Sequence, residues 1–285
     1  MQIGEAIRQT TQSIQNKLGL ELHEASIEAN LLCQQVLDVN RAWLISHAND
    51  ALEANQQAAF EALVHRRLNS EPIAYILGSR EFYGLALKTT PATLIPRPDT
   101  ETLVEAALAK IPQNAILNIL DLGTGTGAVA LAIASNRPQT KISAVDSSLE
   151  ALKVATENAQ SLKLLNVRLI ESNWFSALAL DKEAEKFDVI VSNPPYIAQD
   201  DAHLKQGDLR FEPLSALASG KDGLDDIRQI IQDAPIYLNP NGWLMLEHGF
   251  DQAEAVAALL SERGFSQIDH ARDIAGTLRV TFGAI

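Results

Sequence analysis

Residues 116–127 read Ile-Leu-Asn-Ile-Leu-Asp-Leu-Gly-Thr-Gly-Thr-Gly, and this stretch decides the fold class. The apolar run from Ile116 to Asp121 predicts a buried strand. The glycines between Gly123 and Gly127 allow a tight turn and a close approach of the backbone to a ligand. The residues after Gly127 follow a helical pattern. A strand, a glycine-rich turn and a helix in this order indicate a ligand site at the carboxyl ends of parallel strands.

Strand and helix patterns alternate along the chain after this stretch. We expect strands at 116–121, 141–145, 167–170, 187–192, 243–247, 266–272 and 277–282, of which the last two form a closing pair. Helical patterns occupy 128–135, 148–160, 224–233 and 252–263. This alternation predicts an α/β fold in which a doubly wound, mostly parallel sheet of seven strands carries helices on both faces.

The residues before the sheet divide into a helical part and a connecting part. Residues 1–77 carry helical patterns only, with Asn40 as the expected cap of a short helix. This all-α helical bundle has no catalytic spacing, so we interpret it as a substrate-recognition domain or lid, with a purely structural role as the alternative. Residues 78–92 read as a linking β-hairpin. Residues 93–285 then form the ligand-binding domain.

The segment from Thr93 to Glu101 is a rigid lead-in to that domain, because two prolines flank Arg97. Arg97 is a candidate cation for a carboxylate or a partner, and a solvated arginine is an equally good interpretation. Asp99 is the expected N-cap of the helix that follows.

Composition limits the class of protein. The 285 residues are 46% hydrophobic and carry a net charge of −13, which disfavours non-specific binding to nucleic-acid phosphates. The single cysteine, Cys33, excludes an intramolecular disulfide, and no metal site is expected. The start of the chain does not read as a signal peptide, and no stretch approaches the ~20 apolar residues that span a bilayer. We therefore expect a cytoplasmic protein without a membrane segment.

Three strand ends carry polar residues suited to a nucleoside ligand. The first is the turn from Asp121 to Gly127. The second is Asp146, which lies roughly 20 residues beyond Gly123, the spacing of a carboxylate that binds ribose hydroxyls. The third is the pair Asn173 and Trp174, which suits an adenine ring, with core packing of Trp174 as the alternative. The dinucleotide pattern is Gly-x-Gly-x-x-Gly, and here the third glycine comes one position early.

Asp121 helps to choose between the two nucleoside cofactors that fit this pattern. A carboxylate beside the glycine turn is unfavourable near a pyrophosphate and favourable near an ammonium group. S-adenosylmethionine has an ammonium group, a cationic sulfonium and no phosphate. The pattern therefore favours S-adenosylmethionine over NAD.

The fourth strand ends in Asn193-Pro194-Pro195-Tyr196, a stiff corner in which two prolines fix the backbone. The Asn193 side-chain oxygen and a nearby carbonyl can accept both hydrogens of a planar –NH2 group. The Tyr196 ring can lie against the flat face of that group. We interpret the corner as a site that holds an amide or amino nitrogen, and a simple turn is the alternative.

The glycine turn followed by Asn193-Pro194-Pro195-Tyr196 resembles the class I S-adenosylmethionine-dependent N-methyltransferases. Further segments narrow the resemblance to the peptide chain release factor glutamine N5-methyltransferases, the PrmC/HemK family. These segments are Arg80-Glu81-Phe82, Thr93-Leu94-Ile95-Pro96-Arg97-Pro98-Asp99-Thr100-Glu101, Leu246-Glu247-His248-Gly249 and Arg272-Asp273…Gly276…Arg279-Val280. Together with the helical module, the resemblance covers nearly the whole chain.

The resemblance implies transfer of a methyl group from S-adenosylmethionine to the side-chain nitrogen of the glutamine in a release factor's Gly-Gly-Gln motif, with S-adenosylhomocysteine as product. By position, the cofactor would contact Asp121, Gly123, Thr124, Gly125, Thr126, Gly127, Asp146, Asn173, Trp174 and Asn193. The glutamine would contact Asn193, Pro194, Pro195, Tyr196 and Arg97, with Asn193, Pro194 and Tyr196 as the catalytic group. Many family members carry an acidic residue at the position of Asn173, which weakens the assignment of that residue.

Other functions remain open from sequence alone. Glutamine methylation of a ribosomal protein would use the same corner. Methylation of DNA or RNA amino groups is disfavoured by the acidic charge and by the lack of a basic, aromatic-laced recognition region. A non-catalytic binding protein and a dehydrogenase are the remaining alternatives. The expected assembly is a monomer whose partner is a release factor, with no stable binding to nucleic acid.

Overall fold

The computed structural model describes residues 1–178 and 185–285. The chain divides into two compact units, Met1–Gly78 and Ser79–Ile285. The hairpin that the sequence predicts at 78–92 therefore lies within the second unit, where it consists of the antiparallel strands β1 (Ser79–Phe82) and β2 (Leu85–Lys88).

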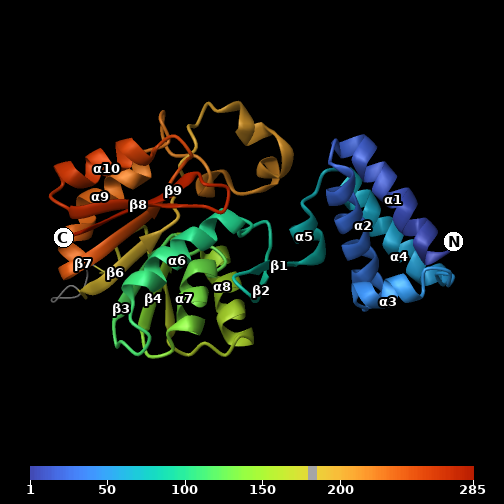
Figure 1. Ribbon diagram of the computed structural model, residues 1–285, viewed down its shortest axis with the longest axis horizontal. Helices are drawn as coiled ribbons and strands as arrows, with labels where there is room; N and C mark the ends of the chain where they lie inside the picture. The colour runs from blue at the N-terminus through green and yellow to red at the C-terminus, as the bar shows by residue number, and fades with distance from the viewer. Residues whose placement is uncertain (179–184) are drawn as a thin grey trace. The chain divides into compact units, whose positions relative to one another are not determined.

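The first unit consists of helices (Figure 1). They are α1 (Ile3–Leu18), α2 (Leu22–Leu37), α3 (Arg41–Ser46), α4 (Ala54–Leu68) and α5 (Ile73–Leu77). Their apolar faces bury a core that includes Ile14, Leu32 and Phe60. Asn40 caps α3 as predicted, because its Oδ1 accepts a hydrogen bond of 2.9 Å from the Trp43 amide. Helix α5 was not predicted, since its five residues are too few to show a period.

The second unit holds a mostly parallel sheet of seven strands, counted over the described residues. The strand order is β5-β4-β3-β6-β7-β9-β8, in which β9 pairs antiparallel with both β7 and β8 and the other pairs are parallel. The strands are β3 (Asn118–Leu122), β4 (Lys141–Asp146), β5 (Val167–Glu171), β6 (Phe187–Ser192), β7 (Leu238–Glu247), β8 (Ser266–Arg272) and β9 (Leu278–Ala284). The predicted fold class is confirmed.

Helices cover both faces of this sheet (Figure 1). One apolar cluster joins α6 (Glu101–Lys110), α7 (Ala128–Asn136) and α8 (Leu149–Ser161) to one face, through residues such as Leu103 and Leu131. A second cluster joins α9 (Asp225–Tyr237) and α10 (Ala253–Glu262) to the other face, through residues such as Ile230 and Val256. Because both faces are covered, the central strands read as continuous apolar runs.

The start of α6 differs from the prediction. Asp99 does not cap this helix, because a short 3-10 helix η1 (Pro98–Thr100) precedes it and no side-chain cap bond forms. The Asp99 carboxylate instead pairs with Arg279 of β9, with an Oδ2–Nη2 distance of 2.9 Å. A tertiary ion pair therefore replaces the predicted local cap.

Candidate active site

A cavity of about 260 Å³ lies in the second unit, where the polar carboxyl ends of β3, β4 and β6 meet. Such a position is typical of ligand sites in open α/β sheets. The cavity is lined by the Pro-rich lead-in, the glycine turn, the end of β4, the turn after β5, the corner after β6, the segment near Pro213 and Asp226 at the start of α9. The predicted residues in the lining are Arg97, Asp121, Gly123, Thr124, Gly125, Thr126, Asp146, Asn173, Trp174, Asn193 and Pro195.

The glycine turn is fixed to the neighbouring strand by its backbone. The amides of Gly123 and Thr124 both donate to the Val145 carbonyl, at 2.9 Å each. Gly127 has φ of +84°, and a Cβ there would lie 2.9 Å from Leu131 Cδ1. The positive φ favours glycine at this position, because other residues adopt that backbone conformation only with strain.

Two carboxylates flank this turn and differ in burial. Asp121 is buried, and its Oδ2 accepts hydrogen bonds from Thr124 Oγ1 at 2.6 Å and from the Ala130 amide at 3.2 Å. Burial raises the pKa of Asp121 to about 6, although both hydrogen bonds oppose the rise. Asp146 is half-buried and accepts from the amides of Gly125 and Ser148, at 2.9 Å each. Both carboxylates therefore shape the turn as well as lining the cavity.

Trp174 and Asn173 lie at the end of the cavity bounded by the turn after β5. Trp174 adopts a positive φ of 48°, and its ring reaches the glycine turn, where a Cβ on Gly123 would lie 3.3 Å from its Cζ3. The Ser172 hydroxyl stabilises this turn by donating to the Trp174 carbonyl at 2.7 Å. Asn173 is exposed and lines the cavity beside Trp174.

The corner after β6 is divided between the cavity and the core. Asn193 and Pro195 line the cavity, whereas Pro194 and Tyr196 are outside its lining. The Tyr196 ring packs against the core cluster beneath α9, and its carbonyl accepts a hydrogen bond of 3.1 Å from Gln252 Nε2. Asn193 Nδ2 donates to Thr100 Oγ1 at 3.1 Å. Contact between the Tyr196 ring and a substrate therefore stays a prediction.

Substitutions of Tyr196 test its role as an anchor of the corner. We expect Tyr196→Ala to lower the free energy of unfolding by about 3 kcal/mol, because it leaves a cavity in an apolar cluster. Tyr196→Phe keeps the ring and loses only a long hydroxyl contact, 3.4 Å to Glu247 Oε1, so its cost should be below about 1 kcal/mol. Chemical denaturation measures both, and equal losses would contradict the anchoring role of the ring.

Arg97 has a carboxylate partner within the chain. Its guanidinium pairs with Glu212, whose other oxygen accepts a hydrogen bond of 2.9 Å from the Ile95 amide. Burial raises the pKa of Glu212, and the charge of Arg97 opposes that rise. The pair ties the Pro-rich lead-in to the segment near Pro213, and both segments line the cavity.

Sequence reasoning missed three residues that organise the site. Glu212 fixes the Pro-rich segment from Thr93 to Glu101 through its contacts with Arg97 and the Ile95 amide. Asn158 of α8 is buried and donates to the carbonyls of Lys88 and Thr126, at 3.1 and 2.9 Å, so it ties the hairpin to the glycine turn. Glu247 ends strand β7 as a buried carboxylate. An acidic residue at the end of an apolar strand is the signal that could have identified Glu247, as it did Asp146.

The described part of the chain lacks two kinds of feature. Within residues 1–178 and 185–285, no helix has the length and apolar character needed to cross a membrane. Over the same residues, no group of three or more His, Cys, Asp and Glu side chains is placed to hold a metal ion.

Two family models match the chain, one in each unit. The PrmC N-terminal domain matches residues 5–78, and the Methyltransferase small domain matches residues 99–209. The release factor glutamine methyltransferase of Salmonella typhimurium is 47% identical over 256 residues, which are 90% of this chain and 91% of that protein. The chain belongs to the release factor glutamine methyltransferase family. The resemblance drawn from the motifs is thereby confirmed.

A second relative and a solved structure are also similar to this chain. The release factor glutamine methyltransferase of Xylella fastidiosa strain Temecula1 is 48% identical over 257 residues, which are 90% of this chain and 92% of its own length. A methyltransferase from Pyrococcus furiosus has a TM-score of 0.52 at 21% identity and covers 81% of this chain and 98% of its own. That likeness supports the fold alone. The two family models together match residues of both the helical unit and the unit that holds the sheet.

Proposed function

We propose that this chain transfers a methyl group from S-adenosylmethionine to the side-chain amide nitrogen of the glutamine in the Gly-Gly-Gln motif of a peptide chain release factor. One observation carries the proposal. Asn193, whose amide suits a glutamine –NH2 group, lines the same cavity as the glycine turn and Asp146. The turn proposed to bind the nucleoside and the corner proposed to bind the amide therefore line one cavity.

The cavity residues fit S-adenosylmethionine. The glycine turn lines the cavity with Gly123 and Gly125, whose positive φ angles favour glycine, and the half-buried Asp146 offers carboxylate oxygens suited to ribose hydroxyls. Asp121 places negative charge in the lining, which complements an ammonium group. Trp174 supplies an aromatic surface for the adenine, beside Asn173. When bound, the cofactor supplies a methyl group carried on a positively charged sulfur.

The corner after β6 would orient the substrate. The lone pair of an amide nitrogen is delocalised into its carbonyl, so the nitrogen is a poor nucleophile. Asn193, which lines the cavity, would accept one of its hydrogens through Oδ1 and direct the nitrogen toward the methyl group. The acceptor proposed for the other hydrogen is the carbonyl of Pro194, which follows Asn193 just outside the lining. Orientation of this kind contributes several kcal/mol to lowering a barrier. No residue of the corner is assigned as a general base, and the proton would leave to water after transfer.

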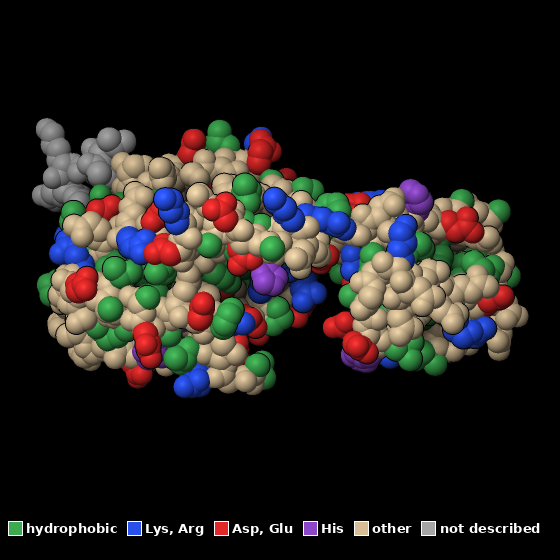
Figure 2. Space-filling view, turned by 90° about the horizontal axis from the view of Figure 1, so that it is seen from above, with side chains coloured by type: hydrophobic (Ala, Val, Ile, Leu, Met, Phe, Trp, Pro, Cys, Tyr) green, Lys and Arg blue, Asp and Glu red, His purple; other side chains and the backbone are tan. Residues whose placement is uncertain are grey.

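The partner we infer is a protein and not a nucleic acid. The net charge of −13 repels phosphates, and on the face seen in Figure 2 the Lys and Arg side chains are interspersed with Asp and Glu. The helical unit would recognise the release factor, and the Arg97–Glu212 pair would shape the entrance to the amide site. We expect the enzyme to act as a monomer in the cytoplasm.

The test uses S-adenosylmethionine labelled on its methyl group. We expect label to enter a purified bacterial release factor and not a variant in which the motif glutamine is replaced by glutamate, which has no amide nitrogen. Equal labelling of the release factor and of its glutamate variant would mean that the methyl group is attached to a residue other than the motif glutamine. Label in isolated ribosomal proteins, with none in the release factor, would favour the alternative substrate class.

A further inference from the structure

Glu247 is a buried acidic residue for which the proposed reaction has assigned no role. It ends β7 with a relative exposure of 1%, and its Oε2 has no hydrogen-bond partner among the described residues. Removing an ionisable carboxyl from water without full pairing is unfavourable for stability. A residue that costs stability at a strand end beside the cavity is a candidate for function.

Glu247 contacts the site through one intermediate residue. Thr100 Oγ1 accepts a hydrogen bond of 3.1 Å from Asn193 Nδ2. The Thr100 side chain is also close enough to the Glu247 carboxyl to oppose, by hydrogen bonding, the rise that burial causes in the Glu247 pKa. A threonine hydroxyl has one hydrogen to donate. When Glu247 is ionised it can only accept, so that hydrogen is directed to the carboxylate and the hydroxyl oxygen is left to face Asn193.

This polarity decides which way the Asn193 amide is turned. An oxygen that can only accept must meet the –NH2 end of the Asn193 amide, so the carbonyl end, Oδ1, turns away from Thr100. Oδ1 is the atom that the substrate amide would meet. In the opposite orientation, Asn193 Oδ1 would face Thr100 Oγ1, so two acceptors would meet. The Asn193 –NH2 group would then face the –NH2 group of the substrate, so two donors would meet there.

We propose that Glu247 is a positioning residue which, through Thr100, fixes the Asn193 amide with Oδ1 toward the substrate nitrogen. This role rests on the proposed function, because the acceptor role of Asn193 comes from it. Glu247 does not touch the reacting atoms.

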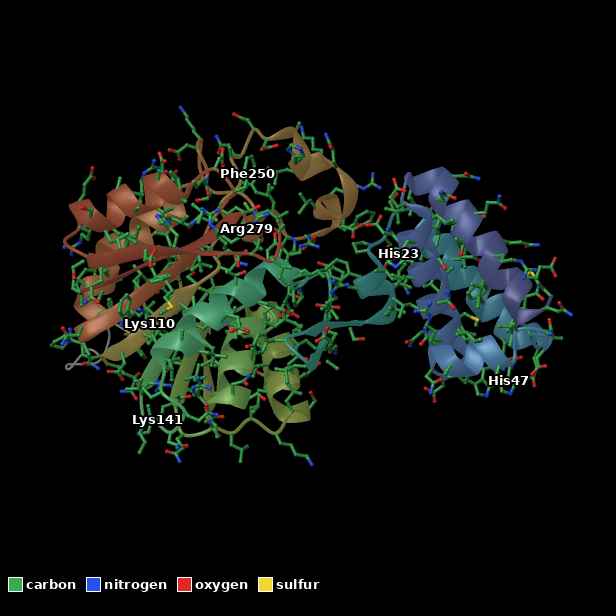
Figure 3. The ribbon with its side chains drawn as sticks, in the orientation of Figure 1. His23, His47, Lys110, Lys141, Phe250 and Arg279 are labelled. Carbon is green, nitrogen blue, oxygen red and sulfur yellow. The ribbon has the colours of Figure 1, made fainter. Side chains whose placement is uncertain are left out.

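The charges around Glu247 give its role a pH dependence. Asp99 of η1 and Arg279 of β9, which is labelled in Figure 3, act on it with opposite signs, and the Tyr196 hydroxyl donates to its Oε1 at 3.4 Å. Arg279 is also paired with Asp99 and Asp273. Burial raises the pKa of Glu247 to about 7. As the pH falls through that value, Glu247 gains a proton that it can donate to Thr100, and the orientation of Asn193 is lost.

A double-mutant cycle tests the link between Thr100 and Asn193. We expect Thr100→Val, which keeps the shape and removes the hydroxyl, to lower kcat by about 10- to 100-fold, with the Kd for S-adenosylmethionine changed less than about twofold. Thr100→Ser should restore most of kcat. In an Asn193→Ala background, Thr100→Val should cause no further loss, because the two residues act as a unit. Additive losses would overturn the proposal.

A measurement that needs no activity tests Glu247 itself. In 15N-labelled protein, the Asn193 side-chain NH2 resonances, assigned by their loss in Asn193→Ala, should shift with pH around a midpoint near 7. In Glu247→Gln the shift should disappear, while the Tm stays equal or rises, because a buried ionisable group has been removed. A titration that persists in Glu247→Gln belongs to another group and overturns the proposal. Because this result is independent of methyl transfer, it also separates a failure of the proposal from a failure of the proposed function.

Discussion

Asn193→Ala is expected to lower kcat by about 10²–10³-fold. The variant removes the side-chain oxygen that would accept a hydrogen from the substrate amide in the transition state. Loss of one preorganised polar contact at a reacting group costs a factor of this size. Because Asn193 is held by Thr100, the oxygen it presents is fixed before the substrate arrives. Single-turnover methylation of a release factor, with S-adenosylmethionine at saturation, measures the effect on the chemical step.

Binding and stability serve as the controls for this result. The Kd of S-adenosylmethionine for Asn193→Ala should stay within a fewfold of the wild-type value, because the other lining residues are intact. Asn136→Ala is the matched variant, since within the described residues the Asn136 amide donates to the Ala132 carbonyl of its own helix, at 2.9 Å. It should leave kcat unchanged. If Asn193→Ala keeps near-normal kcat, Asn193 does not act as the acceptor.

The second large effect is expected from Asp146→Ala, which should raise the Kd for S-adenosylmethionine by about 10²-fold or more. The carboxylate would lose its hydrogen bonds from the ribose hydroxyls, and bonds to charged groups contribute about 1.5–3 kcal/mol each. The variant also frees the amides of Gly125 and Ser148, which hold the turn in shape. Isothermal titration calorimetry on the purified protein measures the Kd directly.

Asp188 offers a closely matched control for Asp146. It lies on β6 and also accepts two hydrogen bonds, from the Asn118 amide and from Asn239 Nδ2, at 2.8 Å each. It lies near the amino end of its strand, whereas the cavity lies at the carboxyl ends. Asp188→Ala should therefore lower stability without changing the Kd. Equal weakening of cofactor binding in both variants would mean that Asp146 acts only through the fold.

Sequence periodicity predicted the sheet well because its strands are buried on both faces. Runs such as Phe187–Ser192 are mostly apolar, with Asp188 near the start and Ser192 at the end. The local sequence pattern gave a wrong or incomplete prediction where contacts between distant segments determine the structure. Asp99 reads as a helix cap, but Arg279 is distant in sequence and only the fold brings the two side chains together. Helix α5 is too short for a period to emerge.

In the candidate site too, some residues were predictable from the sequence and others were not. The glycine turn, Asp146 and Asn193 were predicted because each follows a strand whose carboxyl end faces the cavity. The partners of these residues were not predicted, since Thr100 and Glu212 meet the site through contacts between distant segments. The motif could not show that Tyr196 packs against the core, because a four-residue pattern does not indicate which side chain faces the apolar cluster.

Peptide mass spectrometry of a release factor incubated with the enzyme and S-adenosylmethionine tests the central claim most directly. We predict a single added methyl group, which fragment ions place on the side chain of the glutamine in the Gly-Gly-Gln motif. The modification should be absent when Asn193→Ala replaces the wild-type enzyme over the same short incubation. A methyl group on any other residue of the release factor, or an unmodified release factor despite measured cofactor binding, would contradict the account.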